Sequence, residues 1–76
     1  MKAHVLIKIR AGEVSEAVKQ MRGIKGVVEA NATFGPYDAV AVVEAKDLPS
    51  LGRIVTGEIQ PVVGVQETLT CLVIEI

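Results

Sequence analysis

Apolar and polar residues alternate along the first ten positions of the chain. Every second residue in the stretch 3–10 is apolar, which is the period of a β-strand with one covered face. The alternation predicts a strand over residues 3–10, and the set expected to face the rest of the domain is Ala3, Val5, Ile7 and Ile9.

The apolar spacing changes to three and four in two later segments. Residues 13–22 carry one apolar stripe, with acidic residues near the start and basic residues near the end, which complements a helix dipole. Asp47 is a good N-cap for a second helix, and Pro49 is tolerated in its first turn. Since Pro61 cannot continue a helix, we expect this second helix to end before it.

Strand-like alternation returns over residues 27–34 and 65–76, and residues 39–45 between them are predicted to form a strand that is apolar on both faces. The segment Gly35–Asp38 is the strongest turn signal in the chain and joins the first two of these strands as a hairpin. The resulting order is βαββαβ. With right-handed crossovers, this order predicts a single α+β, ferredoxin-like domain over residues 1–76, with a four-stranded antiparallel sheet and both helices on one face.

The second face of this sheet is expected to be more apolar than a solvated surface requires. A domain of 76 residues is also marginally stable alone. We therefore expect two copies to pack sheet to sheet as a two-fold homodimer, or the face to meet another partner. The alternative is a merely apolar surface. The residues assigned to this face are Leu6, Leu72, Ile74, Ile76 and one apolar set of strand 39–45.

Composition narrows the classes of function. The formal net charge is −1 and the basic residues are scattered, so direct binding to nucleic acid is not expected. No apolar run approaches the roughly 20 residues of a membrane span, and the N-terminus does not resemble a signal peptide. We expect a cytoplasmic protein. The single cysteine, Cys71, lies in an apolar run and is expected to be a buried thiol.

Residues suited to catalysis are few. His4 is the only histidine, expected to be exposed, and Ser15 and Ser50 are the only serines, both near helix starts. These residues do not make up a catalytic set of nucleophile, general base and orienting group. The sequence also contains no glycine-rich loop of the kind that binds phosphate. The sequence predicts neither an enzyme nor a bound cofactor or metal.

The turn at residues 33–38 has groups that could hold a small ligand. Backbone N–H groups around Gly35 suit a carboxylate, Asp38 suits an ammonium group, and Tyr37 offers a rigid surface and a hydroxyl. Together these match the head group of a free amino acid. The same residues are also explained by ordinary hairpin chemistry, and the residues alone leave both interpretations open.

Six segments carry a family resemblance in their order and spacing. They are Ala3–Lys8, Gly23–Ala30, Thr33–Asp38, Asp47–Leu48, Leu51–Gly52 and Gly64–Thr70. Over essentially its whole length the chain resembles the C-terminal ligand-binding (RAM) domain of the Lrp/AsnC transcription regulators. It departs from the family in lacking the N-terminal helix-turn-helix, and Phe34 stands as an extra residue in the turn. With this departure we expect either a stand-alone sensing module or one part of a longer protein.

In this family, the domains pair through their sheets and the dimers assemble into rings such as octamers. The resemblance implies a small-molecule effector, usually an amino acid, bound between dimers near the turn. Carried over to this chain, the ligand-binding residues are Gly35, Tyr37 and Asp38, with Thr68 and Thr70 as weaker candidates because threonine is common in strands. The module would act through mixed assemblies with full-length Lrp/AsnC regulators, or through another partner.

Other functions use the same fold. A ligand-free oligomerisation adaptor would respond to no amino acid. A small enzyme of the dimeric α+β barrel type would need a hollow lined by His4 or other polar groups. An ACT-like domain would bind its amino acid near Ala11–Glu13 rather than at the turn. Fold analogy alone does not choose among these functions.

Overall fold

The βαββαβ order is confirmed in the computed structural model, which describes all residues from 1 to 76. The two α-helices lie close to the predicted segments, and neither is long and apolar enough to cross a bilayer. The elements are β1 (Lys2–Ile9), α1 (Val14–Arg22), β2 (Val27–Ala32), β3 (Ala39–Glu44), α2 (Leu48–Ile54), a π-helical turn η1 (Val55–Ile59) and β4 (Val65–Leu72).

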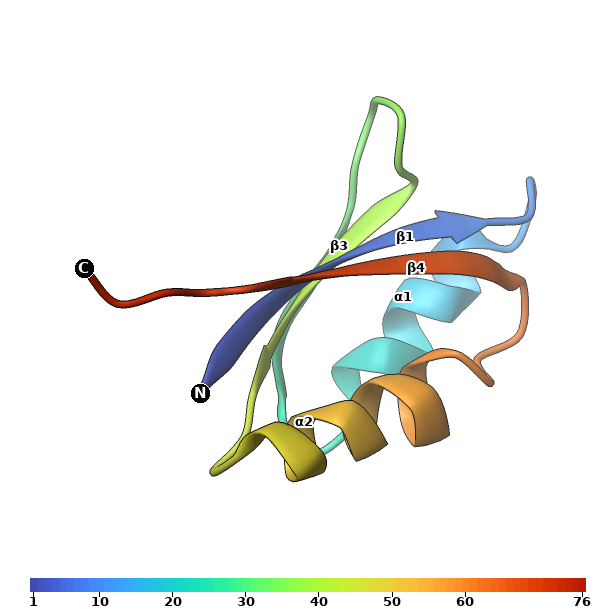
Figure 1. Cartoon of the computed structure of the whole chain (residues 1–76). Coiled ribbons are helices and arrows are strands. Elements are labelled where there is room, and N and C mark those ends of the chain that lie inside the picture. The colour runs from blue at the N-terminus through green and yellow to red at the C-terminus, as the bar shows by residue number, and fades with distance from the viewer.

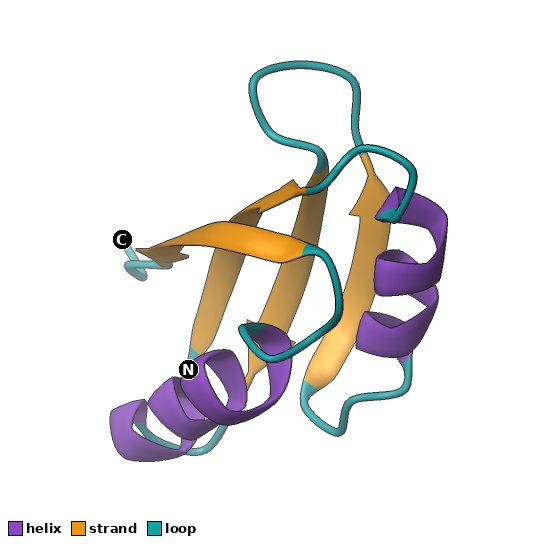
Figure 2. Cartoon of the chain, turned by 90° about the vertical axis from the view of Figure 1, so that its right-hand side faces the viewer, coloured by secondary structure: helices purple, strands orange, loops and turns teal.

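The four strands form one antiparallel sheet in the order β2-β3-β1-β4. Figures 1 and 2 show both helices on the same side of this sheet. The predicted ferredoxin-like architecture is therefore confirmed. One face of the sheet is covered by the helices, and we call the other the open face.

The core lies between the sheet and the helices and contains no buried polar or charged residue. Large and small side chains face each other across the two central strands. Val5 of β1 is opposite Ala41 of β3, and Ile7 is opposite Ala39. All four are fully buried. The small residues of β3 leave room for the helices to approach, so the layers can interdigitate.

The second helix begins and ends where the sequence predicts. The Asp47 carboxylate accepts a hydrogen bond of 2.8 Å from the Ser50 N–H, as an N-cap does. The hydrogen bonds from the Ser50 side chain and backbone hold the pKa of Asp47 below its usual value, with a smaller contribution from the Arg53 charge. After α2 the helix continues as the wider π-helical turn η1, which ends at Ile59, before Pro61.

Two of the predicted strands extend well beyond the strands observed. β2 ends at Ala32, before the turn, and β4 ends at Leu72 rather than at residue 76. A bulge in β2 also shifts the register, so that Val27 is opposite Val43 while Val28 is 57% exposed. A bulge adds one residue to a strand and moves the following side chains to the other face, which strict alternation could not predict.

The assignment of β4 to the two faces was wrong. Leu72 is opposite Ala3, on the side of the helices, whereas Leu69 and Cys71 are opposite Leu6 and His4 on the open face. Cys71 is exposed in the single chain, which corrects the expectation of a buried thiol. Both alternating sets of β4 contain apolar residues, so the face depends on the pairing register with β1.

The open face therefore differs from the predicted set. Ile74 and Ile76 lie beyond β4, in a tail that leaves the domain, and both are exposed (Figure 1). The apolar part of the open face consists of Leu6, Val40, Val42, Leu69 and Cys71, with His4 among them.

Candidate functional site

The loop between β2 and β3 projects beyond the end of the sheet (Figure 1, green). Two hydrogen bonds close it at its base. The Thr33 N–H donates to the Asp38 carbonyl oxygen at 2.9 Å, and the Thr33 hydroxyl donates to the Tyr37 carbonyl oxygen at 2.8 Å. These bonds give the loop a defined shape without help from a ligand.

Asp38 ties the loop to β1. Its backbone N–H donates to the Ile7 carbonyl oxygen at 2.9 Å, and its Oδ2 accepts a hydrogen bond of 2.8 Å from the Ile9 N–H. The Oδ1 atom makes no hydrogen bond within the chain. One carboxylate oxygen thus has a structural role, while the other is available to a ligand donor.

Tyr37 lies beside a positive charge. The Lys8 ammonium group is 5.9 Å from the centre of the Tyr37 ring, within the range of a cation–π contact. Tyr37 is half-buried and Lys8 is exposed on β1. Lys8 adds a cation near the turn, whereas the sequence placed it only among the scattered basic residues. No local pattern could have identified it, because Lys8 lies 29 positions before Tyr37.

The tip of the loop is open to solvent. A Cβ placed on Gly35 would meet no atom within 4 Å, and Phe34 is fully exposed, at 109%. The N–H groups of Phe34 and Gly35 make no hydrogen bond within the chain, and Pro36 has no N–H. A ligand at this turn would be enclosed only if a second molecule covered it.

The two threonines lie on β4, on the other side of β1 from the turn. Thr68 is opposite Ile7, and Thr70 is opposite Val5, nearer the middle of the sheet. Two strand spacings separate Thr68 from the base of the turn, or about 10 Å. The Thr68 hydroxyl accepts a hydrogen bond of 3.1 Å from the Gln60 side chain. The structure brings Asp38 and Thr68 to the same end of the sheet but leaves Thr70 apart.

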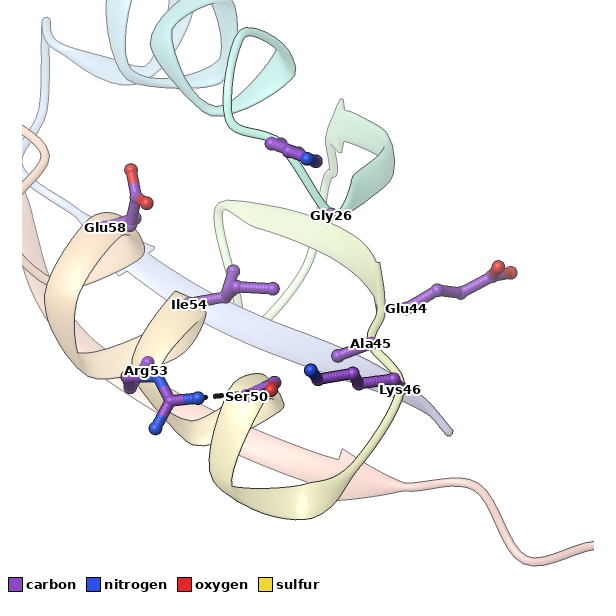
Figure 3. A pocket seen from close by; sticks show the side chains of 9 residues that line it. Gly26, Glu44, Ala45, Lys46, Ser50, Arg53, Ile54 and Glu58 are labelled. Carbon is purple, nitrogen blue, oxygen red and sulfur yellow. Dashed lines mark hydrogen bonds between the residues drawn. The ribbon is translucent and has the colours of Figure 1, made fainter.

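Surface hollows lie away from the loop tip. One, of about 310 Å³, includes Thr68 and Gln60 in its lining. A larger one, of about 620 Å³, lies at the opposite end of β3, where three cations and two carboxylates share its walls (Figure 3). There the Arg53 guanidinium donates to the Ser50 hydroxyl at 3.2 Å. Because charges of both signs line this hollow, and Asp47 also lies close to Arg53, the hollow has no clear preference for an anionic ligand.

The turn combines a free carboxylate oxygen, exposed N–H groups and an aromatic surface beside a cation. This set can hold a small zwitterion by complementary charges and hydrogen bonds. Nowhere do three or more His, Cys, Asp or Glu side chains come together as a group that could hold a metal ion. The groups at the turn are therefore suited to binding a small ligand.

The family model for the Lrp/AsnC ligand binding domain matches residues 2–76. This match confirms the resemblance seen in the sequence, and it is to a ligand-binding domain of regulators rather than to a family of enzymes. The HTH-type transcriptional regulator Ptr1 of Methanocaldococcus jannaschii is 33% identical over 66 residues, which are 87% of this chain and 45% of Ptr1. The chain thus spans less than half the length of that curated relative.

Solved structures show the same fold. TTHA0845 from Thermus thermophilus has a TM-score of 0.93 and 35% identity, covering 99% of this chain and 94% of that one. The transcriptional regulator NMB0573 of Neisseria meningitidis, solved as a complex with L-Met, has a TM-score of 0.85 and 21% identity. That alignment covers 97% of this chain and 49% of the regulator.

Proposed function

Because this chain belongs to the Lrp/AsnC ligand-binding domain family, we propose that it senses an amino acid effector and assembles into oligomers that respond to it. The observation that carries the proposal is the turn. It presents the unbonded Oδ1 of Asp38, the Tyr37 ring beside Lys8, and exposed N–H groups around Gly35. These groups match the ammonium and carboxylate of an amino acid.

The effector would bind between subunits. The loop tip is exposed in the single chain, so a second molecule is needed to exclude water from the ligand. Phe34 at the tip is a large exposed aromatic, the type of residue that anchors protein interfaces. We infer that Phe34 contacts a neighbouring dimer, and that Thr68 approaches the ligand more closely than Thr70 does.

The dimer would form through the open face. Its apolar centre has charges of both signs at both ends, with Lys2 opposite Glu44 at one end and Lys8 opposite Glu67 at the other. A two-fold partner presents the same surface reversed, so opposite charges can meet at each rim. A second copy of this chain therefore fits the face, and full-length relatives with the same domain are further candidates for mixed assemblies.

A ligand-free adaptor is the second candidate. The Asp38 carboxylate already accepts a bond from the Ile9 N–H, and the Thr68 hydroxyl already accepts one from Gln60. Both residues therefore have a structural reason to be present. An adaptor would use the open face and Phe34 for assembly and would ignore amino acids.

Thermal unfolding with each common amino acid separates these two functions, with L-Met tested first because one solved relative was crystallised with it. At 100 times its dissociation constant, a ligand stabilises a protein by about 2.7 kcal/mol. Each kcal/mol raises the melting temperature of a small domain by about 4–8 °C. We expect at least one amino acid to produce such a shift, and Asp38→Ala to abolish it.

Asp47→Ala is the matched control. It removes a different aspartate that accepts a backbone hydrogen bond, far from the turn. We expect it to lower the melting temperature but to keep the shift with the amino acid. Flat curves across the whole panel would contradict the sensor and favour the adaptor.

A further inference from the structure

A histidine lies within the apolar part of the open face. His4 of β1 sits between Val42 of β3 and Cys71 of β4, its two cross-strand partners, and Leu6 is the next residue of β1 on this face. His4 is exposed in the single chain and makes no ion pair. A partner that covers the apolar centre would therefore cover this imidazole too.

The charged and titratable groups that face His4 come from the strands alone, because both helices lie on the other side of the sheet (Figure 2). On β1 the nearest is Lys2, which is opposite Glu44 of β3. On β2, Glu29 is one strand further out, opposite Val42. On β4 the facing group is the Cys71 thiol, and the far end of the face holds Lys8 and Glu67.

No carboxylate is directly opposite His4 on either neighbouring strand, and Glu44, two positions along β3 from Val42, has Lys2 opposite it. A proton on the imidazole therefore gains little compensation inside the chain. An imidazole changes its charge between about pH 5 and 8. Removing the charged form from water costs more than removing the neutral form.

We propose that His4 makes the sheet-to-sheet dimer sensitive to pH, so that acidification releases monomers. This inference rests on the proposed pairing of the open faces. A two-fold dimer buries two copies of His4, so it holds fewer protons than two separate chains. By linkage, lowering the pH favours the state that binds more protons, which is the monomer.

Sedimentation velocity over a concentration series, at about pH 7.5 and about pH 5.5 and at constant ionic strength, measures the effect across the range where imidazole titrates. For the natural chain we expect the dimer dissociation constant to rise about tenfold or more on acidification, which is about 1.4 kcal/mol per dimer. His4→Gln keeps a polar side chain that cannot be charged, and its dissociation constant should change by less than about twofold. Glu67→Gln, which removes a carboxylate from the rim of the same face, should retain the pH response.

The outcomes separate this inference from the pairing itself. If the dimer keeps its dissociation constant at the lower pH, or if His4→Gln weakens as much as the natural chain, the role of His4 is overturned and the pairing stands. A chain that is already monomeric at the higher pH would remove the pairing and this inference with it. Circular dichroism at the lower pH must show intact secondary structure, since unfolding there would assign the response to another cause and overturn the proposal.

Discussion

Two aspartates show how single residues shape this chain. Asp47 accepts a hydrogen bond from the N–H of Ser50, three positions away, and Asp38 accepts one from the N–H of Ile9, 29 positions away. Both bonds measure 2.8 Å. The first is local and starts a helix. The second joins the β2–β3 loop to β1, so it sets the place of the candidate site.

The cap made by Asp47 should depend on pH. Its pKa in the folded chain lies below the usual value of 3.8, because the carboxylate accepts hydrogen bonds from Ser50. A lowered pKa means that the ionised form stabilises the fold. This stabilisation is present above the unfolded pKa and is lost as the pH falls through the folded one. We expect Asp47→Ala to lower the melting temperature at neutral pH, and the difference from the natural chain to shrink below about pH 4.

Thermal melts of both proteins between about pH 7 and pH 3 test this dependence. Asp47→Asn is the control, because asparagine caps helices about as well but does not titrate. A difference between Asp47→Ala and the natural chain that stays constant down to the lowest pH would contradict the role of the ionised carboxylate.

At the scale of elements, two glycines have opposite effects on the stability of the fold. Gly26, between α1 and β2, has a φ of +100°, and a Cβ there would come within 2.5 Å of Ile54 Cδ1. Gly52 lies inside α2, where a Cβ would meet nothing within 4 Å. Gly26 is thus needed for a tight approach between the start of β2 and α2. Gly52 only weakens its helix.

Replacing each glycine by alanine should therefore have effects of opposite sign. We expect Gly26→Ala to destabilise the fold by about 1–3 kcal/mol, because of its left-handed backbone and the contact with Ile54. Gly52→Ala should stabilise it by about 0.5–1 kcal/mol, because alanine loses less entropy in a helix. Urea unfolding measures both values. Changes of the same sign would contradict the different roles of these two glycines.

At the scale of the whole molecule, the open face is the largest unexplained feature of a single chain. Helices cover one side of the sheet, while Leu6, Val40 and Val42 lie on the other without a cover. All three are only half-buried. Burying such a surface stabilises a small domain by roughly 25 cal/mol per Å², which is the physical reason for the proposed dimer.

A charge in the middle of this face should separate the subunits. Val40 is opposite Leu6 on the open face, and Val40→Glu would place a carboxylate in the apolar centre of the proposed interface. We expect this variant to remain folded and to sediment as a monomer at concentrations where the natural chain is dimeric, since an unpaired buried charge is strongly unfavourable.

Ser15→Glu adds the same charge to the exposed first turn of α1, on the other side of the molecule, and should remain dimeric. A folded dimer of Val40→Glu would show that the subunits pair through another surface. Sedimentation and circular dichroism together distinguish separation from unfolding.

The order of the elements follows from the sequence alone, because the periods of helices and strands are local properties. Caps and turns are local as well, which is why Asp47, Pro61 and the segment 35–38 were identified from the sequence. The six segments that resemble the Lrp/AsnC family are equally visible in the linear chain, and the family match confirms them. The sequence therefore determined the fold class, the family and the position of the candidate turn.

Pairing between distant strands decided the rest. The bulge at Val28 and the face presented by Leu69 and Cys71 depend on register, and an apolar strand does not specify its register by pattern. The Lys8 ammonium beside Tyr37, like the Ile9 N–H that binds Asp38, comes to the turn only through tertiary structure. Local periodicity predicts which residues share one face of a strand. Which residues of a neighbouring strand lie beside them depends on the pairing of strands in the folded sheet.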